Sequence, residues 1–309
     1  MKIGAGVGRF GGSEADVLSI VNQAVDAEDS GLDAVWFNHI LGTDSLIALS
    51  LAGQKTKNVE LVTGVIPIYS REPLLMAQQA LTAQVAAQGR LFLGIGLAHP
   101  ETAPLTWNHA YDRPAHFMEE YLAVLMPLIE KKTVEFSGDF ITTQGTIEFP
   151  EVPPPSVLLA ALGPRMLKMA GESTDGTLLW VTGPKTIRNH VAPRIRAAAE
   201  LAKRPDPRIS AALPICLTDD TGLAHQVAER QFSRYGRLVN YRRVLDIEGV
   251  EGPQDVALIG NEEQVESQLH ELADAGATDF YAAFFKLGKD DKESIPRTKA
   301  FLKKIVGRI

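Results

Sequence analysis

The sequence predicts an α/β protein built as one (β/α)8 barrel, a TIM barrel, that spans residues 1–309 as a single domain. Short apolar runs alternate with helical stretches along the whole chain, which indicates parallel strand pairing. The apolar runs are nearly continuous, as expected for strands that are buried on both faces. Eight strand–helix pairs match a closed barrel with insertions better than an open doubly wound sheet, and no G-x-G-x-x-G motif follows the first run.

Each predicted strand is a short run dominated by aliphatic and aromatic residues. In chain order the strands are Lys2–Val7, Ala34–Phe37, Glu60–Ile66, Leu91–Ile95, Val157–Ala161, Thr177–Val181, Ile209–Leu217 and Asp279–Phe285. Helical periodicity marks the segments between them, with proline at several starts and glycine after several ends. The predicted helices are Ser13–Ser30, Thr43–Gln54, Pro73–Gln88, Arg113–Glu130, Pro164–Glu172, Pro184–Ala202, Leu223–Arg234, Glu262–Ala275 and Ile295–Val306.

Two short insertions interrupt this alternation, after the fourth and the seventh strand. The first, Lys132–Pro155, holds the apolar pieces Val134–Phe136 and Phe140–Thr142 around Gly138 and Asp139, which indicates a small β-excursion. The second, Tyr241–Ile259, is polar and contains glycine, so we expect a loop. Neither insertion is long enough to form a second domain.

Composition limits the classes of partner. The net charge of −7 argues against a nucleic-acid or anionic-membrane partner, because such partners attract basic surfaces. Cys216 is the single cysteine, so an internal disulfide or a cysteine zinc site is excluded. The sequence shows neither a signal-peptide pattern nor an apolar run near the ~20 residues of a membrane span. We therefore expect a cytoplasmic protein with a small-molecule substrate.

The active site of such a barrel lies at the carboxyl ends of its strands, which selects the residues to consider. They are Asn38 and His39, Gly64–Pro67, Gly94–His99, Leu162–Arg165 and Thr182–Lys185. The last two segments each place a glycine and a proline at the start of a helix, where free N–H groups bind phosphate. Ordinary turn chemistry is the alternative interpretation of the same Gly-Pro pairs.

His39 follows the second strand directly and is suited to proton transfer, although a hydrogen-bonded structural histidine fits the same position. His99, His109 and His116 follow the fourth strand, and no histidine pair shows metal-ligand spacing with a third ligand, so we expect no metal site. Aromatic residues gather in the same region, as the floor of an apolar substrate pocket or as a packed lid: Trp107, Tyr111 and Phe117.

Three stretches resemble the luciferase-like monooxygenase superfamily: Gly89–Gly96, Tyr111–Pro114 and Ala160–Met166. The resemblance runs over essentially the whole chain, and the order of these stretches is specific to that superfamily. Within it, the sequence most resembles the deazaflavin-dependent oxidoreductases of actinobacterial type. The resemblance implies a (β/α)8 barrel with an insertion, which agrees with the independent strand count, and it implies a homodimer.

The resemblance also implies where a cofactor lies. Its ring is held at the mouth of the barrel, in front of a non-prolyl cis peptide that falls on Gly64-Val65, and the loops after the fifth and sixth strands take its phosphate. His39 falls near the reacting face of the ring. The implied cofactor-binding residues are Gly64, Val65, Gly94, Gly96, Ala161, Leu162, Gly163, Pro164, Arg165, Thr182 and Gly183.

The chain departs from the deazaflavin sugar-phosphate dehydrogenases, which carry an acid where Asn38 stands, and an amide is neither acid nor base near neutral pH. We therefore expect hydride transfer between coenzyme F420 and a small organic substrate, such as an enone or a carbonyl compound. Asn38 and His39 are the expected catalytic residues, and His99, Trp107 and Tyr111 shape the substrate pocket. The alternatives are an FMN-dependent monooxygenase and a flavin- or deazaflavin-binding protein without turnover.

Overall fold

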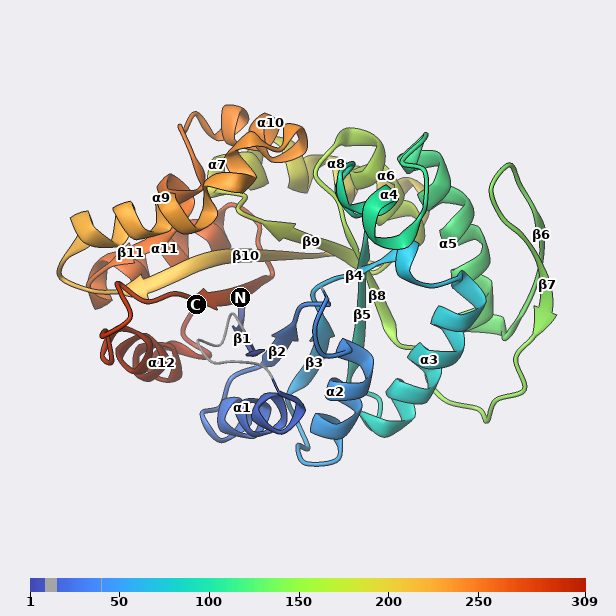
Figure 1. Ribbon diagram of the computed structural model, residues 1–309, viewed down its shortest axis with the longest axis horizontal. Coiled ribbons are helices and arrows are strands. Elements are labelled where there is room, and N and C mark those ends of the chain that lie inside the picture. The colour runs from blue at the N-terminus through green and yellow to red at the C-terminus, as the bar shows by residue number, and fades with distance from the viewer. Residues whose placement is uncertain (9–15, 40) are drawn as a thin grey trace.

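The computed structural model describes residues 1–8, 16–39 and 41–309, and this part of the chain forms a closed barrel of parallel strands (Figure 1). Each strand pairs with the next in the series, and the last pairs with the first, which closes the ring. The predicted fold class is thus confirmed. The eight barrel strands are β1 (Lys2–Gly6), β2 (Ala34–Phe37), β3 (Glu60–Thr63), β5 (Leu91–Gly96), β8 (Ser156–Ala160), β9 (Gly176–Trp180), β10 (Arg208–Leu217) and β12 (Asp279–Phe284).

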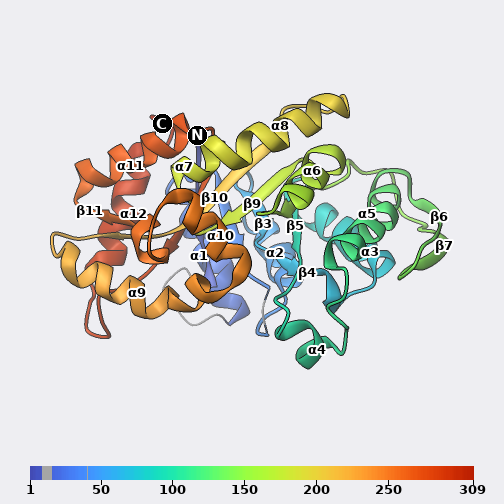
Figure 2. The same cartoon turned by 90° about the horizontal axis from the view of Figure 1, so that it is seen from above.

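Helices surround the barrel, as Figures 1 and 2 show from two directions. Among the described residues they are α1 (Val17–Asp29), α2 (Ser45–Gly53), α3 (Pro73–Ala86), α4 (Thr102–Trp107), α5 (Pro114–Lys131), α6 (Pro164–Ser173), α7 (Pro184–Thr186), α8 (Ala192–Leu201), α9 (Thr221–Arg237), α10 (Val239–Glu248), α11 (Glu262–Asp274) and α12 (Ser294–Ile305). No helix of the described chain is long and apolar enough to cross a membrane. Asp16 caps α1 by accepting from Ser19 N, and the predicted start at Ser13 lies outside the described residues.

Side chains of the strands alternate between two cores. One set points outward and packs under the helices, where it belongs to the large apolar core of the molecule. The other set fills the interior of the barrel and includes Trp36, Val62, Leu158, Leu178 and Tyr281. The interior of the barrel is therefore packed with side chains, as in other barrels of this type.

An ion cluster lies at the amino-terminal ends of the strands. Arg208 begins β10, and its guanidinium donates to Asp279 Oδ2 at 3.1 Å and to Glu60 Oε2 at 2.8 Å. The same guanidinium lies 4.4 Å from the centre of the Phe92 ring. Burial alone would lower the pKa of Arg208, but the two carboxylates outweigh it and raise that pKa above its ordinary value. This cluster closes the end of the barrel that lies opposite the strands' carboxyl ends.

The predicted strand Glu60–Ile66 is broken in the structure. β3 ends at Thr63, the Gly64–Val65 peptide bond is cis, and the short strand β4 (Ile66–Pro67) pairs with β5. A 3-10 turn (Ile68–Ser70) then leads to α3. The predicted helix Pro184–Ala202 is also interrupted, because a π-helical turn (Ile187–Val191) separates α7 from α8.

The predicted loop Tyr241–Ile259 is wrong, because the segment contains most of α10, a 3-10 turn (Pro253–Val256) and β11 (Leu258–Gly260), which pairs with β10. α10 buries Val244 and Leu245 and ends at Gly249, whose positive φ of 80° forms a left-handed cap. The charged residues on the outer face of α10 obscure the helical pattern of this apolar pair in the sequence. The short helix α4, which places Pro104 in its first turns, also went unpredicted.

The segment between α5 and β8 folds into an antiparallel hairpin of β6 (Thr133–Ser137) and β7 (Thr142–Thr146), at the right edge of Figure 1. The second apolar piece was predicted at Phe140–Thr142, whereas the strand begins at Thr142. The carboxylate of Glu120 on α5 accepts the backbone N–H groups of Asp139, Phe140 and Ile141 at 2.7–2.9 Å. One buried side chain thereby attaches the hairpin turn to α5.

Candidate active site

A cavity of about 250 Å3 opens at the carboxyl ends of the barrel strands. Of the residues selected from the sequence, those that line it are Asn38, Gly64, Val65, Leu97, Ala98, His99, Tyr111, Ala161, Leu162 and Gly163. Sequence reasoning missed further lining side chains, which include Trp36, Met166, Trp180, Tyr235, Asn240, Tyr241 and Tyr281. The cavity therefore lies where the barrel rule places an active site, and strand ends, loops and the α9–α10 segment together enclose it.

Two stacked aromatic rings form the floor. The rings of Trp36 on β2 and Tyr281 on β12 lie 5.0 Å apart and are inclined by 10°. Tyr281 Oη donates a hydrogen bond of 3.3 Å to Asn38 Oδ1. Burial raises the pKa of Tyr281 far above its ordinary value, so the hydroxyl keeps its proton. A buried, rigid phenol thus holds the amide of Asn38 from one side.

The glycines of β5 serve packing. A Cβ on Gly94 would lie 1.9 Å from Thr63 O, so this position requires glycine for the strands to approach each other. A Cβ on Gly96 would lie 3.0 Å from Val65 Cγ2 and 2.9 Å from Ala160 Cβ. Gly96 therefore makes room for Val65, which lines the cavity. Neither Gly94 nor Gly96 lines the cavity itself.

The loop after β8 presents the start of a helix to the cavity rim. Gly163 is the N-cap of α6 and provides no side chain to cap it, so the first N–H groups of this helix lack a cap from Gly163. His190 Nε2 lies 2.8 Å from Leu162 O; because a carbonyl oxygen only accepts, the imidazole donates there and supports the loop. The side chain of Arg165 instead forms two bonds with Glu119, at 3.0 and 2.6 Å, and is directed to α5.

In the loop after β9, a carboxylate of the protein itself occupies the backbone N–H groups at the helix start. Glu248, at the end of α10, accepts the backbone N–H groups of Lys185 at 3.1 Å and Thr186 at 2.7 Å. A Cβ on Gly183 would lie 2.4 Å from the carboxylate carbon of Glu248. Thr182 is buried and donates to Trp180 O. The geometry assigns these helix-start amides to Glu248, and α6 is left as the open helix start at the cavity.

His39 lies beside α2 and is absent from the cavity lining. Its Nδ1 accepts the Ser45 backbone N–H at 3.2 Å, so Nε2 is the nitrogen that carries the hydrogen. Burial lowers the pKa of His39, and the nearby Arg71 guanidinium lowers it further. At neutral pH the imidazole is therefore uncharged and is oriented by α2.

Aromatic side chains line the remaining wall. Tyr241 of α10 lies edge-on to Tyr235 of α9, with ring centres 5.1 Å apart, and its ring centre is 6.1 Å from that of His99. Burial lowers the pKa of His99 and raises the pKa of both Tyr111 and Tyr241, so these groups are neutral near pH 7. Trp107, predicted for the substrate pocket, lies on α4 outside the lining.

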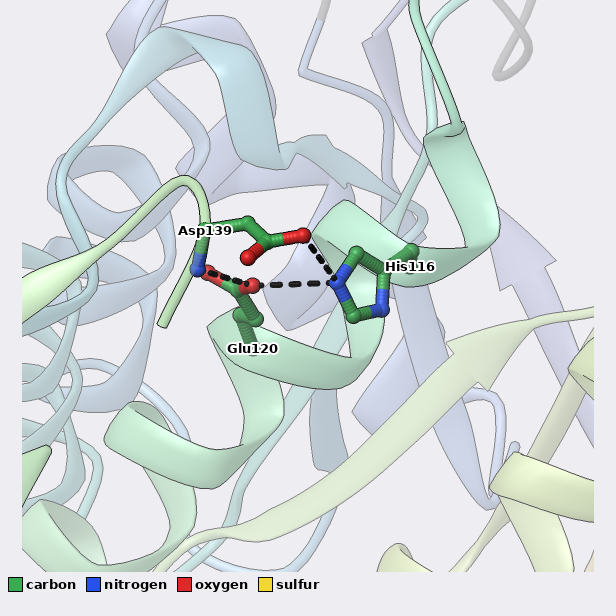
Figure 3. Close-up of side chains that lie close together, drawn as sticks. All are labelled: His116, Glu120 and Asp139. Atoms are coloured by element: carbon green, nitrogen blue, oxygen red, sulfur yellow. Dashed lines mark hydrogen bonds and ion pairs between the residues drawn. The ribbon is translucent and has the colours of Figure 1, made fainter. Parts of the chain in front are cut away.

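Within the described residues, the group whose ligand atoms could gather around a metal ion is His116, Glu120 and Asp139 (Figure 3). His116 Nε2 lies 3.2 Å from Glu120 Oε1 and 3.3 Å from Asp139 Oδ2. Glu120, however, already accepts three backbone N–H groups, and Arg113 donates to Asp139 at 2.8 Å. These partners fit a hydrogen-bonded anchor of the β6–β7 hairpin better than a metal centre.

The profile of the luciferase-like monooxygenase family matches residues 3–279 of this chain. Among curated proteins, a 5,10-methylenetetrahydromethanopterin reductase from Methanolobus tindarius is 28% identical over 212 residues, which cover 67% of this chain and 64% of the reductase. The chain thus spans slightly less than two thirds of the length of that relative.

Two solved structures share the fold over nearly their whole length. An F420-dependent secondary alcohol dehydrogenase in complex with an F420–acetone adduct has a TM-score of 0.81 at 18% identity, with 97% of each chain covered. A monooxygenase from Streptomyces bottropensis has a TM-score of 0.76 at 20% identity, with 98% of each chain covered. At such identities the likeness establishes the fold, and chemistry has to be argued from the site.

Proposed function

Because the chain belongs to the luciferase-like monooxygenase family, we propose that it is an oxidoreductase that transfers hydride between the deazaflavin coenzyme F420 and a small organic substrate, an enone or a carbonyl compound. The observation that carries this proposal is the cavity itself: an aromatic floor and an uncapped helix start face one space at the carboxyl ends of the strands. The reductase named above and the F420-dependent alcohol dehydrogenase of the same fold support this choice of cofactor.

The residues present fit such a cofactor. Gly64 and Val65 line the cavity just after β3, and Leu162 and Gly163 bring the start of α6 to the rim. The N–H groups of that helix start would hold the cofactor's phosphate, because a helix start attracts anions. When bound, the deazaflavin supplies the hydride. The chain supplies position, hydrogen bonds and exclusion of water.

Parallel titrations of the purified protein with F420 and with FMN, followed by fluorescence, test the cofactor. We expect dissociation constants in the micromolar range or below for F420 and markedly weaker binding of FMN. Failure of F420 to bind the folded protein would refute the cofactor assignment.

An FMN-dependent monooxygenase is the second candidate, favoured by the monooxygenase from Streptomyces bottropensis that shares this fold. Reduced FMN reacts with oxygen, whereas a reduced deazaflavin hardly does. Oxygen uptake in step with substrate consumption would therefore replace the first proposal with this one.

We also propose that the protein forms a homodimer through α2 and α3. α2 buries Leu46 and Leu49 against the barrel but also exposes Ile47 and Leu51, which lie one turn apart on its outer face. Leu75 on the neighbouring helix α3 is exposed as well. A helix that is apolar all round is normally covered, and a second copy of this chain would cover it.

A further inference from the structure

The orientation of the Asn38 side chain is fixed by Tyr281. Tyr281 Oη donates to Asn38 Oδ1 at 3.3 Å, and because burial raises the pKa of Tyr281 the phenol keeps the hydrogen that it donates at neutral pH. The stacking of Tyr281 on Trp36 keeps the hydroxyl in place. Because the oxygen of the amide faces Tyr281, the nitrogen of the amide faces the other way.

The other side of Asn38 is the cavity, which this residue lines. Within the described part of the chain, Asn38 Nδ2 has no acceptor at hydrogen-bond distance. An amide nitrogen is a donor only, with two hydrogens to give. The floor of the cavity therefore presents a half-buried hydrogen-bond donor that cannot act as an acid, and a ligand that brings an acceptor can bind to it.

The side chains around this donor carry no formal charge. The described lining contains no Asp, Glu, Lys or Arg, and its titratable groups are histidine and tyrosines. Burial keeps His99, Tyr111 and Tyr241 neutral. A carboxylate or phosphate placed on the floor would lose its water without gaining an opposite charge from these side chains.

We propose that the cavity floor binds a neutral carbonyl compound whose oxygen accepts a hydrogen bond from Asn38 Nδ2, and that Tyr281 is the positioning residue that keeps Nδ2 turned to the cavity. The inference rests on the proposed function and specifies its hydride acceptor. When bound, the reduced deazaflavin would supply the hydride to the carbonyl carbon; the C=O electron pair would move onto the oxygen, and a proton taken up from bulk solvent would complete the alcohol. Asn38 Nδ2 stabilises the charge on that oxygen.

Binding of cyclohex-2-enone tests this without turnover. The enone is titrated into the whole protein, with and without oxidised F420, and the infrared band of its C=O bond is recorded in the bound state. In Asn38→Ala the dissociation constant should rise about 3- to 10-fold and the C=O band should move to higher frequency, since one hydrogen bond is lost. Cyclohexene has the same ring without the oxygen, so its affinity should be equal in both proteins. Cyclohexanecarboxylate should bind more weakly than the enone.

Two further variants separate a positioning role from a structural one. Tyr281→Phe keeps the stack on Trp36 but releases the amide, so the C=O band should shift part of the way toward its position in Asn38→Ala. Asn38→Asp keeps the shape but presents only acceptors, so enone binding should be lost at neutral pH and return on acidification as the new carboxyl group protonates. Circular dichroism checks that each variant is folded.

An unchanged enone affinity and C=O band in folded Asn38→Ala would overturn the inference, and so would equal binding of the enone and the carboxylate. F420 binding together with either result would leave the proposed function intact. An enone that responds to Asn38 in a protein that fails to bind F420 would refute the cofactor assignment and support the inference about the acceptor.

Discussion

The substitution Gly163→Asp should weaken cofactor binding while leaving the fold intact or more stable. Gly163 has φ −87° and ψ 157°, the extended conformation of an N-cap, and a Cβ there would meet nothing within 4 Å. An aspartate fits this position and accepts the N–H of Arg165 or Met166. Replacing glycine by aspartate at an N-cap stabilises a helix by about 0.3 kcal/mol, and the negative charge at the helix start adds to that.

The same carboxylate removes the proposed phosphate site. A phosphate at the start of α6 would lose a charge-assisted hydrogen bond, which contributes about 1.5–3 kcal/mol. Two unit negative charges about 6 Å apart also repel by about 3 kcal/mol at an effective dielectric constant of about 20. Small movements of the phosphate and of the aspartate will relieve part of these two effects, so we take about 3 kcal/mol as the net loss of binding free energy. The dissociation constant of F420 should then rise about 100-fold.

Fluorescence titration with F420 and thermal unfolding of the same samples measure both effects. Gly163→Ser is the matched control, because it caps the helix without a charge and should bind F420 much more tightly than Gly163→Asp. Part of the loss of F420 affinity in Gly163→Asp should persist at high salt, since salt screens a partly buried pair of charges poorly. Unchanged F420 affinity in Gly163→Asp would show that α6 does not hold the phosphate, and a lowered melting temperature would refute the capping argument.

Three other perturbations have outcomes that the structure determines. Arg208→Met leaves the buried carboxylate of Asp279 without its cation, whereas the half-buried Glu60 keeps its pair with Lys2, so the free energy of unfolding in urea should fall by about 3 kcal/mol. Glu120→Gln weakens the anchor of the hairpin turn and should cost about 2–3 kcal/mol. Burial raises the pKa of Glu120, but its three backbone donors outweigh burial and lower that pKa below the ordinary glutamate value. The difference in free energy of unfolding between the wild type and Glu120→Gln should therefore be fully present above the ordinary glutamate pKa. It should disappear as the pH falls through the lowered pKa of the folded protein. Ile47→Glu should convert a dimer to a monomer in analytical ultracentrifugation, with the melting temperature nearly unchanged; a wild-type protein that sediments as a monomer would refute the proposed interface.

The barrel could be predicted because each of its strands is buried on both faces and so carries a continuous apolar run. The same regularity located much of the site: Asn38, Gly64 and Leu162 follow strand ends, and all of them line the cavity. The position of the cis peptide at Gly64–Val65 came from the resemblance and is confirmed by the backbone. These features depend on local patterns that a single chain displays.

The rest depends on contacts between distant segments. The helices α9 and α10 bring three residues to the cavity: Tyr235, Asn240 and Tyr241. The outer face of α10 is polar, and for that reason the sequence analysis predicted a loop there. Tyr281 lies in an apolar strand and could not be distinguished from core, although a large aromatic with a hydroxyl inside a barrel needs a partner for that hydroxyl. No local pattern shows that Arg165 pairs with Glu119.

Three carboxylates near the loops of the site are already matched within the protein. Glu248 turns to the helix start after β9, Glu119 to Arg165, and Asp44 to Arg71, so each of these carboxylates is matched by protein groups outside the lining. The sequence predicted a phosphate site at the second Gly-Pro loop, but the carboxylate of Glu248 occupies the N–H groups there. What the described part of the chain offers a ligand is the helix start of α6, suited to a cofactor's phosphate, and an uncharged floor with the oriented amide of Asn38. Under the proposed function, this arrangement separates the charged end of the cofactor from the place where the substrate reacts, and the oriented amide faces the oxygen on which charge develops.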